Sequence, residues 1–153
     1  MSAVYVASPY GFSPATKRYY DAELLPSLVR AGFDPLDPWA DPDERIALAF
    51  DEADQLEGEA RLAKLRAINT ELAQANVARI EACDVVLAIL DGTDVDSGVA
   101  AEIGYAAARG KRIVGLRLDW RPAGDNDAAL VNLQVEHFLT ATARELDDAL
   151  RLL

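Results

Sequence analysis

The feature that most constrains the fold of this chain is the run DVVLAIL at residues 84–90. Every residue between Asp84 and Asp91 is apolar, with no polar residue at alternate positions. A strand with one face in water alternates, whereas a strand of a parallel sheet is covered on both faces and is apolar throughout. The run therefore predicts a buried strand of a parallel sheet.

Helical patterns flank this strand on both sides. Further strands are expected over residues 3–8, 33–36 and 111–119, with a last short strand or turn within 131–139. Helices are expected over residues 14–31, 57–82, 98–109 and 142–153. Pro26 should kink the first of these helices, because proline has no N–H to donate, unless it starts a second helical segment. This alternation predicts a flavodoxin-like α/β fold, a doubly wound five-stranded parallel sheet flanked by helices.

The segment between the second strand and the long helix is rich in proline and acidic residues. After residues 33–36 it forms an acidic loop, up to Glu44, that either covers a pocket or is surface filler. No internal repeat and no linker interrupts the chain, so residues 1–153 are expected to form one domain.

Composition excludes several classes of function. The net charge of −11 argues against binding a nucleic acid polymer, whose affinity comes from cationic contacts. No apolar run approaches the roughly 20 residues of a membrane helix, and no basic leader precedes an apolar segment, so neither a membrane partner nor secretion is expected. The single cysteine, Cys83, excludes an internal disulfide and fits a reducing compartment. A cytoplasmic location is the expectation.

In a doubly wound sheet, ligands bind where the strand order reverses, outside the carboxyl ends of the strands. Loops over 7–13, 91–97 and 119–132 leave those ends, and they should bring Tyr5, Tyr10 and loop aspartates towards Glu102. Glu102 lies in a helix otherwise built from small and apolar residues. Burying a carboxylate without a partner is costly, so Glu102 needs a partner or a catalytic role. The alternative is a helix N-terminal glutamate that interacts with the helix dipole.

One motif in the second half of the chain is specific. The pattern Asp-x-Asp-Ser-Gly-x-x-x-Glu-x-Gly-Tyr-Ala-x-x-x-Gly-Lys runs from Asp94 to Lys111, and VYVASPYGFS stands near the N-terminus. Together they resemble the nucleoside 2-deoxyribosyltransferase family. The correspondence extends through nearly the whole chain in the same order, including NVARIEACDVV and VNL.

The resemblance implies roles for individual residues. Glu102 matches the catalytic nucleophile, and Tyr5 matches the tyrosine that hydrogen-bonds and orients it. Asp96 matches the aspartate that contacts the region of the sugar 5′-hydroxyl. Asn132 matches an asparagine that reaches into a neighbouring subunit's site, so a homo-oligomer is expected.

The chain departs from the family pattern at Asn76. Family members often carry an aspartate there to handle the nucleobase, and an amide can hydrogen-bond a base but has no titratable proton. Base protonation then uses another group or water, or the base preference differs. Asp91 and Asp94 are possible substitutes, although each is equally explained as a turn-forming loop aspartate.

Four further residues are candidates for substrate binding, each with a structural alternative. Tyr10 and Phe12 either stack on a nucleobase or pack the loop. Ser8 either contacts a ligand or caps the turn, and Gln134 is a candidate because it follows Asn132 closely.

The implied reaction moves a 2-deoxyribosyl group from a 2′-deoxynucleoside to a free nucleobase, as in nucleotide salvage. A carboxylate can trap the oxocarbenium-like sugar as a glycosyl ester on Glu102, and the second displacement gives net retention. Neither a metal nor another cofactor is expected, because His137 and Cys83 are each isolated and offer no ligand cluster.

Two alternatives belong to other classes of function. A related enzyme could be an N-glycosidase that hydrolyses nucleoside 5′-monophosphates, but such relatives tend to carry serine at the position of Asp96. A carboxylate there repels a phosphate dianion. The other alternative is a nucleotide-sensing domain without turnover, against which the combination of Glu102, Asp96 and Tyr5 argues.

Overall fold

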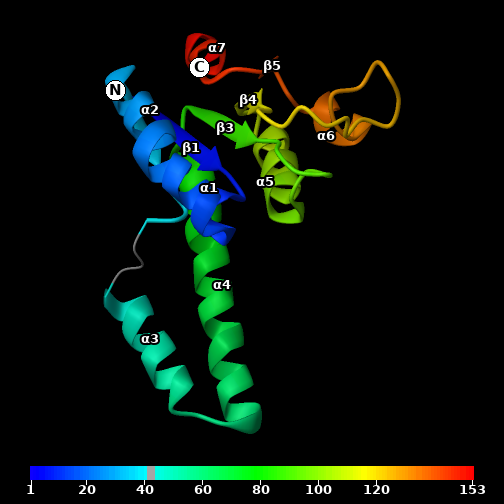
Figure 1. Cartoon of the computed structure of the whole chain (residues 1–153). Coiled ribbons are helices and arrows are strands. Elements are labelled where there is room, and N and C mark those ends of the chain that lie inside the picture. The colour runs from blue at the N-terminus through cyan, green and yellow to red at the C-terminus, as the bar shows by residue number, and fades with distance from the viewer. Residues whose placement is uncertain (41–43) are drawn as a thin grey trace.

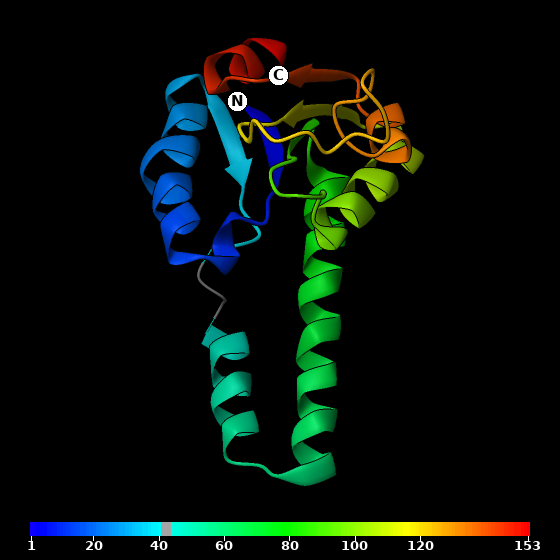
Figure 2. The same cartoon turned by 45° about the vertical axis from the view of Figure 1, so that its right-hand side comes forward.

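The computed structural model describes residues 1–40 and 44–153. Its strands are β1 (Ser2–Ala7), β2 (Phe33–Leu36), β3 (Val85–Ile89), β4 (Arg112–Leu116) and β5 (Ala141–Ala143). Within the described residues they form one five-stranded parallel sheet in the order β2-β1-β3-β4-β5 (Figures 1 and 2). This order confirms the flavodoxin-like prediction, with the reversal of strand order between β1 and β3.

Strand β3 forms the centre of the sheet, as its apolar run predicts. It pairs with β1 on one side and β4 on the other, and all its residues are buried. Leu87 packs into the apolar core on one face, whereas Val86 and Ala88 pack into the core on the other face. Both faces of β3 are covered by protein, which explains why no polar residue interrupts the run.

The helices α1 (Pro14–Tyr19), α2 (Leu25–Arg30) and α7 (Leu146–Leu152) contribute to the core on the first face. The single helix predicted over 14–31 is divided by a π-helical turn, η2 (Tyr20–Leu24), which ends directly before α2. Pro26 lies in the first turn of α2, so it starts a second helical segment, which was one of the two expectations. Tyr20, in the π-helical turn, is completely buried.

The helices α4 (Gly58–Ala82) and α5 (Ser97–Ala108) cover the second face. The first half of α4 extends beyond the sheet and packs against α3 (Glu44–Asp54), a helix that the sequence patterns did not predict. We call α3 and this half of α4 the arm. Its own small core consists of Ile46, Ala53 and Ile68.

The prediction for the segment after β4 is partly wrong. The strand or turn expected within 131–139 is the short helix α6 (Leu133–His137), and the last strand, β5, follows it. Asn132 explains the helix, because its side chain accepts a hydrogen bond from the backbone N–H of Gln134 as an N-cap.

Two other expectations concern particular segments. Residues 41–43, part of the predicted acidic loop, lie outside the described residues. Across the described residues, none of the helices combines the length and apolar character required to cross a membrane.

Candidate active site

A cavity of about 270 Å³ lies at the carboxyl end of β1, where the strand order reverses. Its walls come from the loop after β1, the loop after β2, the middle of α4 and the first turns of α5. The residues that line it are Ser8, Phe12, Pro38, Trp39, Leu72, Asn76, Asp96, Gly98, Val99 and Glu102. Five residues that the sequence analysis singled out, Ser8, Phe12, Asn76, Asp96 and Glu102, therefore surround one space.

A hydrogen bond from Tyr5 holds Glu102, the carboxylate that lines the cavity. Tyr5 points from β1 into the core on the face covered by α5, and it is completely buried. Its hydroxyl donates to Oε1 of Glu102 over 2.7 Å. The structure thus joins the two residues, which stand far apart in the sequence, and gives the half-buried carboxylate the partner that its apolar surroundings require.

Burial and this hydrogen bond act in opposite directions on Glu102. Burial raises the pKa of the Glu102 carboxyl above its usual value of 4.5, the Tyr5 hydrogen bond lowers it, and the charge of Asp96 raises it, with a net rise. The pKa of Tyr5 is strongly raised by burial and by the adjacent Glu102 carboxylate. Tyr5 therefore remains a hydrogen-bond donor at neutral pH, and Glu102 is a more basic carboxylate than an exposed glutamate.

Asp96 occupies the N-cap of α5. Its Oδ1 accepts hydrogen bonds from the backbone N–H groups of Gly98 and Val99, over 2.9 and 3.1 Å. Glu102 lies beyond the first turn of α5, so the alternative explanation through the helix dipole applies to Asp96 and not to Glu102. Because Oδ1 binds the helix terminus, Oδ2 of Asp96 is the oxygen available to a ligand.

An aromatic wall closes one side of the cavity. It consists of Phe12, a candidate from the sequence analysis, and Trp39, which that analysis missed. The rings of Phe12 and Trp39 meet edge to face, with centroids 4.7 Å apart, and Phe12 is largely exposed. The indole Nε1–H of Trp39 donates to the carbonyl oxygen of Ser8 over 2.7 Å. The ring lies directly over Gly11, where a Cβ atom would stand 2.1 Å from Cδ2 of Trp39. Gly11 is needed here for this close approach.

Contacts with the first loops hold the wall in place. Asp37 accepts the hydroxyl of Tyr20 over 2.5 Å and the backbone N–H of Trp39 over 2.8 Å. Ser8 Oγ accepts the backbone N–H of Tyr10 over 3.1 Å. Ser8 therefore caps the turn, as one of its two interpretations predicted, and it also lines the cavity. The interpretation of the acidic loop as a pocket cover fits its described part, since Pro38 and Trp39 line the cavity.

Asn76 lines the cavity from α4, and its amide is held by a neighbour on the same helix. Arg79, one turn further on, donates from Nη1 to Oδ1 of Asn76 over 3.2 Å. Both side chains are partly buried. The sequence analysis identified Asn76 but not Arg79, because an arginine on a surface helix is usually solvated.

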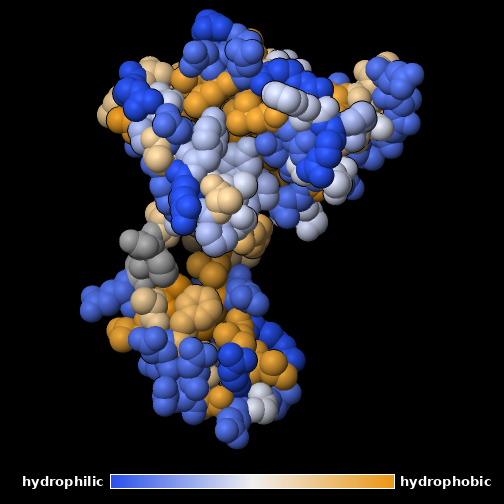
Figure 3. Space-filling model, viewed as in Figure 1, coloured by the Kyte–Doolittle hydropathy of each residue, from blue (hydrophilic) through white to orange (hydrophobic). Residues whose placement is uncertain are grey.

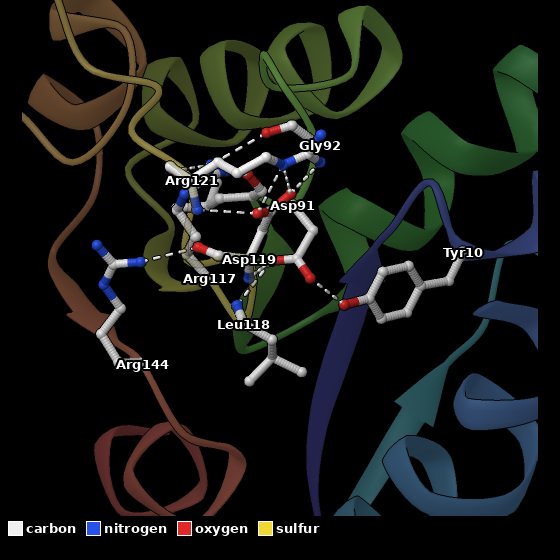
Figure 4. Close-up of polar contacts among 9 residues, drawn as sticks. Tyr10, Asp91, Gly92, Arg117, Leu118, Asp119, Arg121 and Arg144 are labelled. Atoms are coloured by element: carbon white, nitrogen blue, oxygen red, sulfur yellow. Dashed lines mark hydrogen bonds and ion pairs between the residues drawn. The ribbon is translucent and has the colours of Figure 1, made fainter.

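The loop aspartates do not serve the cavity. Asp91 Oδ2 accepts the hydroxyl of Tyr10 over 2.5 Å, and its Oδ1 accepts the backbone N–H groups of Leu118 and Asp119 over 2.6 and 3.0 Å (Figure 4). Asp94 Oδ1 accepts the N–H of Val95. Neither Asp91 nor Asp94 lines the cavity, so both match the turn-forming interpretation.

Tyr10 packs into the core instead of lining the cavity. Its side chain is almost fully buried and meets the ring of Tyr19 edge to face. Of its two interpretations, loop packing is the one that the structure shows, because the bond to Asp91 ties the loop after β1 to the loop after β3.

A buried arginine completes this network. Arg117 is fully buried beyond the end of β4, and its guanidinium donates to the backbone carbonyls of Leu90, Gly92 and Arg121 (Figure 4). These carbonyls belong to the loops on either side, so Arg117 holds the segment that leads into α5. Its only sequence signal was a lone arginine in an apolar stretch, which the sequence analysis did not use.

Asn132 and Gln134 lie away from the cavity. They stand at the start of α6, which lies on the far side of α5 from α1 (Figure 1). The Asn132 side chain caps α6 and contacts Asp125, and Gln134 is exposed. The structure therefore does not bring either residue to the Glu102 cavity of the same chain.

Comparisons with known proteins agree with this architecture. The model of the family described as nucleoside 2-deoxyribosyltransferase matches residues 4–141. No curated protein matches the sequence.

Three solved structures resemble nearly the whole chain. A conserved protein of Enterococcus faecalis V583 has a TM-score of 0.69 at 24% identity, covering 99% of this chain and 96% of its own. A 2-deoxyribosyltransferase of Leishmania mexicana has a TM-score of 0.69 at 23% identity, with the same coverage of 99% and 96%. A 2-deoxyribosyltransferase of Bacillus psychrosaccharolyticus has a TM-score of 0.65 at 18% identity, covering 96% and 89%. At these identities the likeness establishes the shared fold.

The raised pKa of Glu102 predicts a pH-dependent gain in stability for Glu102→Gln. Between the pKa of the unfolded chain and the higher folded pKa, the folded protein binds more protons than the unfolded one, so the free energy of unfolding falls as pH rises. Glutamine still accepts the Tyr5 hydroxyl but does not ionise. The difference in Tm between variant and parent should therefore grow from about pH 4 upward and level off above the folded pKa. A Tm difference that is constant with pH would contradict the burial effect.

The close contact at Gly11 predicts that Gly11→Ala displaces Trp39. The added methyl group overlaps the indole, so the ring must leave its place and lose its hydrogen bond to Ser8. In a Trp120→Phe background, Trp39 is the one remaining tryptophan, so the fluorescence emission comes from it. This emission should shift to the red in Gly11→Ala, because the indole becomes more exposed to water. Gly104→Ala, whose added methyl group has no neighbour within 4 Å, is the matched control and should leave the spectrum unchanged. An unshifted spectrum for Gly11→Ala would contradict the packing of the wall.

Proposed function

The chain belongs to the nucleoside 2-deoxyribosyltransferase family, and from this premise we propose that it transfers a 2-deoxyribosyl group between nucleobases through a covalent ester on Glu102. The observation that carries the proposal is the hydrogen bond from buried Tyr5 to Oε1 of Glu102 at the wall of the cavity. Tyr5 holds the carboxylate in one orientation and engages one oxygen, which leaves Oε2 to form a bond to the sugar.

In the first half of the reaction, Oε2 of Glu102 attacks C1′ of a 2′-deoxynucleoside as the C1′–N bond breaks. Positive charge on the sugar ring grows in this oxocarbenium-like transition state, and the carboxylate stabilises it. The raised pKa of Glu102 makes the oxygen a stronger base and nucleophile once ionised. The base departs with the bonding electron pair and takes a proton.

In the second half, a nitrogen of another base attacks C1′ from the side that the first base left. The C1′–O bond to Glu102 breaks, the carboxylate reforms, and the incoming base loses its proton. Two inversions at C1′ give net retention. Water in place of the second base gives hydrolysis, which we expect as a side reaction.

The proton for the departing base does not come from the loop aspartates, since Asp91 and Asp94 point elsewhere. Asn76 lies at the cavity but carries no titratable proton. We propose that water supplies this proton, and that Asn76 contributes a hydrogen bond to the base.

The position of Asp96 supports a nucleoside over a nucleoside monophosphate. Asp96 lines the cavity with its Oδ2 available, whereas the neighbouring Ser97 does not line it and is exposed. A carboxylate accepts a hydrogen bond from a sugar 5′-hydroxyl, but it repels a phosphate dianion at the same place. The N-glycosidase alternative therefore has less support than transfer, and the chemistry suits nucleotide salvage.

We also propose that the protein works as a homo-oligomer in which Asn132 reaches a neighbouring subunit's cavity. The location of Asn132 outside the cavity of its own chain is compatible with such an exchange. The arm exposes large apolar side chains for a second copy to cover (Figure 3): Leu48 and Phe50 on α3, and Leu62 on α4.

Incubation with 2′-deoxyinosine and adenine tests the reaction. We expect 2′-deoxyadenosine to form in the parent protein and not in Glu102→Ala, because the variant has no nucleophile. Chromatography of the four nucleosides and bases measures both transfer and hydrolysis. Far-UV circular dichroism should show that the variant keeps its fold.

Other outcomes of this assay separate the alternatives. Hypoxanthine release without 2′-deoxyadenosine would indicate a hydrolase, and binding without turnover would indicate a sensor. Full activity in Glu102→Ala would contradict the assignment of the nucleophile.

Mixing two inactive variants tests the role of Asn132. Glu102→Ala lacks the nucleophile, and Asn132→Ser changes the amide while keeping a hydroxyl able to cap α6. If Asn132 acts in the neighbouring subunit, mixed dimers contain one complete site, and random exchange should restore about a quarter of the parent activity. No recovery after subunit exchange, or full activity in Asn132→Ser alone, would contradict the shared site.

A further inference from the structure

The bond between Arg79 and Asn76 determines which atom of the Asn76 amide faces the cavity. An asparagine amide presents an acceptor, Oδ1, on one side and a donor, the Nδ2 amino group, on the other. A guanidinium carries only donors and stays charged, so the atom that faces it must be oxygen. Arg79 donates to Oδ1 of Asn76 over 3.2 Å, and this orientation follows from the chemistry of arginine.

Arg79 stands outside the cavity while Asn76 lines it. Because Oδ1 is engaged by a residue outside the cavity, the Nδ2 amino group is the part of the amide that this inference assigns to the ligand. Within residues 1–40 and 44–153, no carboxylate lies within ion-pair distance of Arg79, so no acidic side chain competes for the guanidinium. Its positive charge instead lies near Tyr5, whose pKa it lowers against the larger effect of burial.

A donor at this position discriminates between nucleobases by their exocyclic groups. A free asparagine amide pairs well with adenine, accepting from the 6-amino group and donating to N7. Arg79 occupies one of the two lone pairs of Oδ1 and restrains rotation of the amide, so this two-point pairing is weakened. A base with a carbonyl oxygen at the same ring position accepts a hydrogen bond from Nδ2 instead.

We propose that Arg79 is a positioning residue for base specificity, which holds Asn76 as a hydrogen-bond donor and so favours bases with an exocyclic carbonyl over those with an amino group. The proposal rests on the proposed function, because it assumes that a nucleobase occupies the cavity beside Asn76. It names the substrate class as 6-oxopurine or 4-oxopyrimidine deoxynucleosides.

Matched pairs of glycosyl donors test this role. The members of each pair, 2′-deoxyinosine with 2′-deoxyadenosine and 2′-deoxyuridine with 2′-deoxycytidine, differ in the exocyclic oxygen or amino group and the protonation of the adjacent ring nitrogen. Arg79→Met removes the donor while keeping a long side chain and a good helix former. The freed amide can rotate, so the kcat/KM ratio of carbonyl to amino substrate should fall by about five- to tenfold, the effect of one hydrogen bond.

Arg79→Lys is the matched control. A lysine ammonium is also a donor without an acceptor, so it should still hold Oδ1 and keep the ratio within about twofold of the parent. A general structural effect of substitution at position 79 would lower kcat/KM for both members of a pair and leave their ratio unchanged. An unchanged ratio in Arg79→Met, or an equal change in both variants, would overturn the proposal.

Binding separates failure of this inference from failure of the proposed function. If no deoxynucleoside is consumed by the parent, the proposed function fails, and calorimetry with hypoxanthine and adenine then measures the same preference without turnover. Tighter binding of hypoxanthine in the parent, reduced in Arg79→Met and retained in Arg79→Lys, would support the role of Arg79. Equal effects on both bases, or no binding of either, would overturn it.

Discussion

The hydrogen bond between Tyr5 and Glu102 is the interaction on which the cavity depends. It joins the central part of the sheet to the helix that carries the carboxylate, across the core that β1 and α5 share. Without a donor, a carboxylate among Val99, Ile103 and Ala106 would either lose its charge or turn to solvent. With the donor, it keeps one oxygen in a defined place and directs the other to the cavity. The stability of the fold and the geometry of the site are therefore linked at one contact.

The surrounding structure restricts the movement of this contact. Asp96 caps α5 and sets where the helix begins, while Arg117 and Asp91 hold the loops that lead to it through backbone hydrogen bonds. Tyr10 connects the same loops to the first turn after β1. These buried polar groups all lie at the carboxyl ends of the strands, where parallel strands leave main-chain groups without partners. Polar residues that hold the loops thus stand next to polar residues that face the cavity.

Sequence patterns predicted most of the fold and about half of the surroundings of the cavity. The apolar run of β3 and the alternation of helices with strands were sufficient for the sheet, because burial on two faces leaves a strong local signal. Helix α3 was missed although Ile46, Ala49 and Ala53 recur at helical spacing, because the segment follows a proline-rich acidic stretch that reads as a loop. The strand or turn expected within 131–139 is instead a helix, because the side chain of Asn132 caps its N-terminus. Trp39 was missed because it stands in no recognisable motif, and Arg79 was missed because the motif NVARIEACDVV that contains it assigns it no role.

By itself the sequence determined the layer architecture, the small-residue helix with its carboxylate and the family resemblance, all of which depend on residue type and spacing along the chain. Only the tertiary structure decided which polar groups meet. It turned Asp91 and Tyr10 towards each other and placed Trp39 over Gly11, whereas the contact of Tyr5 with Glu102 was already implied by the family resemblance. The direction of a side chain depends on partners distant in sequence and on the rotamer that packing allows, so local sequence patterns do not predict it. The same holds for Asn76. The sequence identified it as a candidate, but its contact with Arg79 sets the orientation of its amide.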